Sequence, residues 1–132
     1  MGSLLLVTGA SIAAISAAVH VYIFVLESLL WRRPSTWRVF GLRTQADAET
    51  TRPIAYNQGF YNLFLALGIA VGIAPLGANP SAGIALLLTS TLSMVLAALV
   101  LVTSNRRMLR AAAIQGLPPL LSTLSVALSF AA

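Results

Sequence analysis

The fold is decided by the stretch GSLLLVTGASIAAISAAVHVYIFVLESLLW, residues 2–31, which is small and apolar almost throughout. It exceeds the roughly 20 apolar residues that a helix needs to cross a bilayer. Its only Asp, Glu, His, Lys or Arg residues are His20 and Glu27. Such a group inside a membrane segment costs about 3 kcal/mol or more unless it is paired or hydrated. His20 and Glu27 are therefore candidate functional residues, on one helix face and about 10 Å apart along the axis.

The composition of the whole chain points the same way. Of 132 residues, 58% are hydrophobic and 8% are charged, and the mean hydropathy is +0.91. A soluble domain would carry roughly a quarter charged residues. The formal charge of +5 does not indicate nucleic-acid binding, because the eight basic residues are arginines that flank apolar runs, as membrane anchors do. The absence of cysteine excludes disulfides, thiolate metal sites and a cysteine nucleophile.

Four apolar segments are long enough to span a membrane, at about residues 3–31, 53–76, 81–104 and 109–130. Pro53 is expected in the first turn of the second span. Short connections favour antiparallel neighbours, so we expect one domain, residues 1–132, folded as an all-α, integral membrane, up-and-down four-helix bundle. The small-residue pairs Gly68/Gly72 and Ala14/Ala18 are expected at helix contacts.

The arginines predict the orientation. Five lie between the first two spans and three between the last two, whereas the remaining loop and both termini have none. By the positive-inside rule both termini are extracytoplasmic. The first span lacks the basic start of a signal peptide and is too long for one, so we expect it to be retained. The chain is expected to be a multi-pass protein of the inner (plasma) membrane.

Polar side chains from three spans fall in one layer near the cytoplasmic side. In the first span a single helix face carries Ser16, His20, Phe24, Glu27 and Trp31. The second and fourth spans add the following candidate ligand-binding residues, with Trp31: Tyr56, Asn57, Gln58, Tyr61, Asn62 and Gln115. We expect a cavity that opens toward the cytoplasm. Structural roles stay open, because such side chains also cap or join helices, and Glu27 could clamp an arginine of the first loop.

Known catalytic and cofactor motifs are missing. The chain has no phosphate-binding loop, dinucleotide fingerprint or nucleophile elbow. One histidine and one nearby glutamate are too few for a zinc site, and only His20 could ligate a haem. We therefore expect no metal and no cofactor.

Two blocks of residues resemble a known family. The first is His20-Val-Tyr-Ile-Phe-Val-Leu-Glu27 with Trp31, and the second is Asn57-Gln58-Gly59-Phe60-Tyr61-Asn62 with Phe64-Leu65-Ala66. Together they resemble small four-span proteins of bacteria and some fungi, catalogued as a domain of unknown function (number 1304). The resemblance covers nearly the whole chain. It implies a four-helix membrane fold with the His, Glu, Asn and Gln positions as signature residues, and it implies no activity.

Three functions remain open. The chain could bind or transport a small or amphipathic ligand, with a proton carried by Glu27 or His20, in which case we expect a homo-oligomer. It could instead be a cofactor-free isomerase or hydratase for a lipid-like substrate, with His20 and Glu27 as general acid and base. Finally, it could be an accessory subunit of a membrane complex. Whether it is an enzyme is undecided; the expected partners are the lipid bilayer, a hydrophobic or small-molecule ligand, and further membrane subunits.

Overall fold

The computed structural model describes residues 1–132 and is helical throughout, without strands. Its elements, in chain order, are α1 (Gly2–Phe24), η1 (Val25–Leu29), α2 (Pro34–Val39), α3 (Gln45–Ile73), α4 (Pro80–Ser104), η2 (Arg106–Met108) and α5 (Leu109–Leu128). Four helical segments are long and apolar enough to cross a membrane: Gly2–Leu29, Gln45–Ile73, Pro80–Ser104 and Arg106–Leu128. The all-α class is thereby confirmed.

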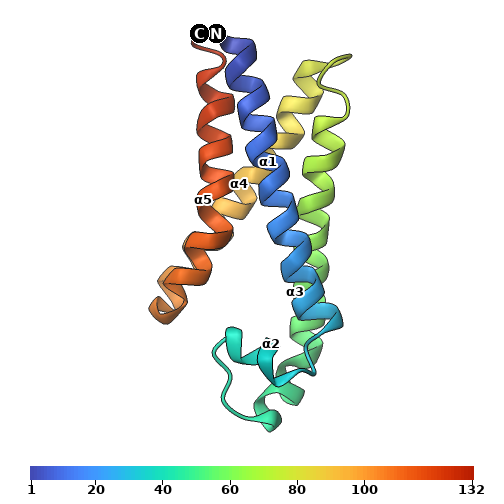
Figure 1. Cartoon of the computed structure of the whole chain (residues 1–132), viewed down its shortest axis with the longest axis vertical. Helices are drawn as coiled ribbons and strands as arrows, with labels where there is room; N and C mark the ends of the chain where they lie inside the picture. The colour runs from blue at the N-terminus through green and yellow to red at the C-terminus, as the bar shows by residue number, and fades with distance from the viewer.

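The four long helices form a closed ring of neighbours. α1 packs against α3 and α5, and α4 packs against the same two helices, so α1 and α4 are diagonal. Consecutive long helices run in opposite directions, and both ends of the chain lie together, far from α2 (Figure 1). The arginine-rich first loop and the termini therefore lie at opposite ends of the bundle.

Small residues bring the helices together in the half that contains the termini. A Cβ at Gly9 would lie 3.1 Å from the backbone nitrogen of Val126, and one at Gly72 would lie 3.0 Å from that of Leu87. A Cβ at Gly68 would collide with the Ser90 hydroxyl, so the expected packing role of Gly68 and Gly72 is confirmed. The expectation for Ala14 and Ala18 is wrong, because both are exposed. The face that α1 buries is the adjacent stripe of Gly9, Ala13, Ser16 and His20.

Hydroxyl groups reinforce the contacts of α5. Ser122 donates to the carbonyl of Gly9 at 2.8 Å, and Ser125 donates to that of Leu5 at 2.8 Å. On the other side of α5, Thr123 donates to the hydroxyl of Thr91 at 2.9 Å. This half of the bundle is consequently closed.

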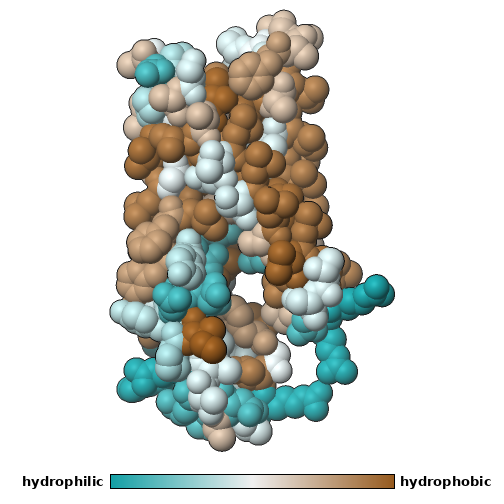
Figure 2. Space-filling view, turned by 180° about the vertical axis from the view of Figure 1, so that it is seen from behind, coloured by the Kyte–Doolittle hydropathy of each residue, from teal (hydrophilic) through white to brown (hydrophobic).

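The opposite half is more open. There α1 and α3 stay paired, and so do α4 and α5, but the two pairs diverge toward the end that carries α2 (Figure 1). Figure 2 shows an opening through the molecule in this half, with hydrophilic residues beside it and below it, whereas the other half is mostly hydrophobic. The bundle is therefore closed at one end and divided at the other.

The start of α3 differs from the sequence-based expectation. The helix begins at Gln45, not near residue 53, so Pro53 lies inside it rather than in its first turn. Thr44 caps the helix, because its hydroxyl oxygen accepts from the backbone N–H of Asp47 at 3.1 Å. The first loop is thus largely helical, with α2 and two polar turns of α3.

Candidate functional site

Glu27 lies in η1, where the first membrane helix changes its winding. The N–H of Leu30 bonds to the carbonyl of Val25 at 2.9 Å, which is the i to i+5 pattern of a π-helical turn. Such single turns rotate the following side chains relative to a regular α-helix, and they recur at functional sites. The turn brings both Glu27 and Ser28 against α3.

Gly59 permits the close approach of this turn to α3. A Cβ at Gly59 would collide with the hydroxyl of Ser28 and lie 3.1 Å from both the Cβ of Glu27 and the backbone nitrogen of Ser28. The Ser28 hydroxyl donates to the carbonyl of Tyr56 at 2.9 Å, which joins the two elements one turn earlier in α3. Edge-to-face packing of Phe24 on Phe60, with 5.1 Å between ring centroids, completes the contact.

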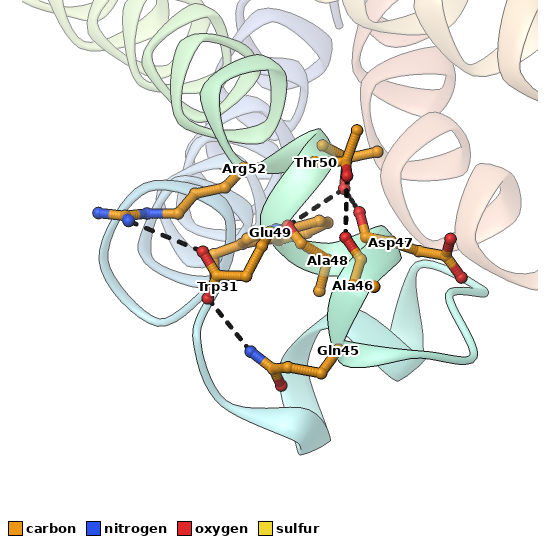
Figure 3. A network of polar contacts seen from close by, with 9 residues as sticks. Trp31, Gln45, Ala46, Asp47, Ala48, Glu49, Thr50 and Arg52 are labelled. Carbon is orange, nitrogen blue, oxygen red and sulfur yellow. Dashed lines mark hydrogen bonds and ion pairs between the residues drawn. The ribbon is translucent and has the colours of Figure 1, made fainter.

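The carboxylate of Glu27 is half-buried and is held by an amide rather than by a cation. Oε2 accepts from the side-chain amide of Asn62 at 3.0 Å, and no basic residue pairs with the carboxylate. The chain's one ion pair joins Arg52 to Glu49 at 4.0 Å on the exposed surface of α3 (Figure 3). The hypothesis that Glu27 pairs with an arginine of the first loop is therefore wrong.

Trp31 fixes the chain directly after η1. Its indole N–H donates to the carbonyl of Ala48 at 2.9 Å, within the polar first turns of α3 (Figure 3). Trp31 is buried with Trp37, Ala48 and Ala55, and Phe40 packs on its ring at 5.1 Å between centroids. A second small core thus lies below the bundle.

The turn after α2 directs the chain back into this small core. Gly41 has a φ of 83°, a left-handed conformation that glycine adopts without strain. The N–H of Gly41 bonds to the carbonyl of Arg38 at 3.0 Å, and that of Leu42 to the carbonyl of Trp37 at 3.3 Å. This Schellman motif ends α2 and lets Leu42 pack on the core formed by Trp31 and its neighbours.

An open pocket of about 200 Å³ lies between η1, the first loop and α3. Its lining is mostly apolar, with one carboxylate, one amide and one hydroxyl. The lining residues are Glu27, Trp31, Phe40, Leu42, Thr51, Ile54, Ala55 and Gln58. Three of the sequence-predicted site residues, Glu27, Trp31 and Gln58, are therefore brought together, and Asn62 holds one of them.

His20 lies elsewhere. It is 2% exposed, and its Nδ1 donates to the carbonyl of Ser16 at 2.9 Å, one turn earlier in α1. It does not line the pocket with Glu27, and no hydrogen bond joins the two. The ring is a buried part of the helix interface.

The remaining sequence-predicted residues also lie outside the pocket lining. Tyr56 and Tyr61 are 53% and 54% exposed, Asn57 is exposed, and Gln115 is half-buried on α5. The pocket thus draws on η1, the first loop and α3, and not on α5. No group of three or more His, Asp or Glu side chains is close enough together to hold a metal ion.

Sequence reasoning missed several residues that shape the site. Phe40, Leu42 and Thr51 fall between the first two expected spans, and Ile54 and Ala55 fall at the start of the second, where apolar residues are expected in any case. Only Gly59 carried a usable signal, because a glycine within a helical block often marks close backbone approach. The π turn at Val25–Leu29 leaves no comparable signal.

These features define a helical membrane protein with four candidate spans and, at one end, a mostly apolar pocket with a carboxylate in its wall. Residues 14–127 match the family model described as "Protein of unknown function (DUF1304)", and the chain belongs to that family. No match was found among curated proteins or among solved structures.

Proposed function

We propose that this protein binds a small amphipathic molecule in the pocket beside Glu27. The observation that carries the proposal is the pocket's lining: a half-buried carboxylate at one wall and apolar or aromatic side chains over most of the rest. Apolar walls with a few placed polar groups are typical of sites for small organic ligands. A ligand's polar head would meet Glu27 and Gln58, and its apolar body would lie against Trp31 and Phe40.

The proposal includes an orientation. All eight arginines lie in the first loop, the start of α3, η2 and the start of α5, which are at one end of the bundle. The positive-inside rule assigns that end to the cytoplasm and both termini to the opposite side of the inner (plasma) membrane. The pocket then lies at the cytoplasmic interface, where amphipathic molecules concentrate.

Acid–base catalysis by the pair His20 and Glu27 is less favoured than ligand binding, because His20 is buried away from the pocket. A through-pore is also disfavoured, since the half with the termini is closed by serine and glycine contacts. If the protein moves its ligand across the membrane, a second copy is needed to complete the path, and we include a homo-oligomer in the proposal for that case.

The test is extraction of purified protein, followed by mass spectrometry of the bound small molecules. We expect a specific molecule in the wild-type protein and its loss in Glu27→Gln. Glu49→Gln is the matched control, because Glu49 is an exposed carboxylate of the same loop region that pairs with Arg52 outside the pocket. Equal extracts from all three proteins, each shown to be folded by circular dichroism, would contradict the proposal.

A further inference from the structure

We propose that the ligand of this pocket is an organic cation, an amine or quaternary ammonium with a small apolar body. The inference rests on the proposed binding function and adds the chemical class of the ligand. Three features carry it: an accessible carboxylate without a cationic partner, aromatic side chains in the same lining, and a restricted volume.

The first feature is the charge of the pocket. Glu27 is the only ionisable residue of the lining, and the other seven side chains have no ionisable group. Its Oε2 accepts from Asn62, while Oε1 has no partner within the chain and is not buried from solvent. A half-buried carboxylate with one free oxygen favours a cation, because an opposite charge is its strongest available partner.

The arrangement of the arginines sharpens this point. The chain carries eight of them and three acidic residues, so a surplus of cations was available to neutralise Glu27. All eight arginine side chains are exposed, and the one that pairs with an acid uses Glu49. The fold therefore keeps its own cations out of the pocket, and Glu27 stays free for a cation from outside.

The second feature is aromatic. Trp31 and Phe40 both line the pocket, with 5.1 Å between ring centroids and planes inclined at 55°. Trp and Phe faces attract ammonium groups through their ring quadrupoles. The indole N–H of Trp31 is already bonded to the carbonyl of Ala48, so this mostly buried residue has no free donor for a ligand and can contribute only ring contacts. A carboxylate with aromatic neighbours and no free donor from Trp31 disfavours anions.

The third feature is size. The pocket measures about 200 Å³. A closed apolar cavity of about 150 Å³ accommodates benzene. The volume therefore suits one ring or a short alkyl chain with its ammonium head, and because the pocket is open, any larger part of a ligand would extend beyond it.

The experiment uses the full chain in nanodiscs and a Trp37→Phe background, so that Trp31 is the sole tryptophan and reports from the pocket wall. Three probes of similar size are titrated: benzyltrimethylammonium, its uncharged carbon analogue neopentylbenzene, and benzenesulfonate. Empty nanodiscs correct for partitioning into lipid. We expect the ammonium to change Trp31 emission with an affinity at least about tenfold above the other two.

Three variants show which residues cause the preference for the ammonium. Glu27→Gln should abolish the advantage of the ammonium over neopentylbenzene, whereas Glu49→Gln should keep it. Phe40→Leu should weaken binding of the ammonium more than binding of the neutral analogue, because it removes an aromatic ring and leaves every charge in place. This variant tests the proposal even if Glu27→Gln fails to fold.

The outcomes separate the two proposals. Equal affinity for ammonium and neutral analogue in the Trp37→Phe protein would overturn the cation proposal while binding itself stands. A preference that survives Glu27→Gln would overturn it as well. If no probe binds and extraction yields no specific molecule, both proposals fail; if extraction yields a neutral molecule, only the cation proposal fails.

Discussion

The side-chain amide of Asn62 donates a 3.0 Å hydrogen bond to Oε2 of Glu27 and a 3.1 Å hydrogen bond to the carbonyl of Gln58. One amide group thus joins α3 to η1, through two residues 35 positions apart in the sequence, and fixes the carboxylate at the pocket wall. Because only one carboxylate oxygen is used, the contact orients Glu27 without neutralising it.

Asn62→Ala should lower stability by about 1 to 2 kcal/mol, because it removes a hydrogen bond to a charged group. The matched control is Asn57→Ala, in the same helix, where the side chain is exposed and makes no hydrogen bond within the chain. Thermal unfolding in detergent measures both. A melting temperature lowered equally by the two changes would refute a special role for the Glu27 contact.

Gly59→Ala should separate η1 from α3. The added methyl group meets Ser28 and Glu27, and two of the three nearest atoms, the Ser28 nitrogen and the Glu27 Cβ, cannot rotate away. We expect a loss of about 1 to 3 kcal/mol, as for other overpacked contacts. Gly77→Ala is the control, since a Cβ there has no neighbour within 4 Å. Thermal unfolding checks the pair, and an unchanged melting temperature for Gly59→Ala would rule out the tight contact.

Trp31→Phe and Trp37→Phe delete the same atoms but should differ in cost. The indole of Trp31 donates to Ala48, whereas the buried Nε1 of Trp37 has no hydrogen-bond partner. Losing the Trp31 hydrogen bond should cost about 1 kcal/mol more than losing the unsatisfied donor of Trp37. Denaturant unfolding of the two variants measures the difference, and the reverse order would contradict the assigned hydrogen bonds.

His20→Asn should affect stability and not ligand binding. The ring is buried and bonded to Ser16, so its replacement leaves a gap in the helix interface. We expect a melting temperature lowered by several degrees and unchanged ligand retention in the surviving folded protein. If His20→Asn lost its ligand but kept the wild-type melting temperature, His20 would again be a candidate for a binding or catalytic role.

Single cysteines can test the proposed orientation, because the chain has none of its own. Ser3→Cys and Ala46→Cys are both at exposed positions, at opposite ends of the bundle. We expect a membrane-impermeant maleimide to label position 3 in intact cells and position 46 only after lysis. Labelling of position 46 from outside would invert the orientation.

Much of the architecture could be predicted from long apolar runs, because the thickness of a bilayer sets the length of apolar helix that crosses it. The start of α3 could not be predicted in this way, because residues 45–52 are mostly polar and show no regular spacing of apolar residues. A signal was nevertheless present: Thr44 followed three residues later by Asp47 is an N-cap pattern, and the structure uses it. Membrane-interface helices are easily overlooked when only hydropathy is considered.

The site was predictable only in part. Glu27, Gln58 and Asn62 could be brought together from helical spacing and depth, because both quantities are regular. The partner of Trp31 could not, since it is a backbone carbonyl, at Ala48, which any residue type would supply. Phe40 and Leu42 reach the pocket through the left-handed turn at Gly41, and their final position depends on tertiary packing rather than on a local pattern.

The serine hydrogen bonds between α1 and α5 join residues 113 and 120 positions apart. During synthesis α1 therefore enters the bilayer well before the serines that will bond to it exist. Until then its small-residue face, with Gly9, is open to lipid or to insertion factors, while α3 and α4 can already pair through their short turn. The ring of helices can close only after α5, the last helix to be synthesised, has also entered the bilayer, so the contacts of α1 with α5 form last.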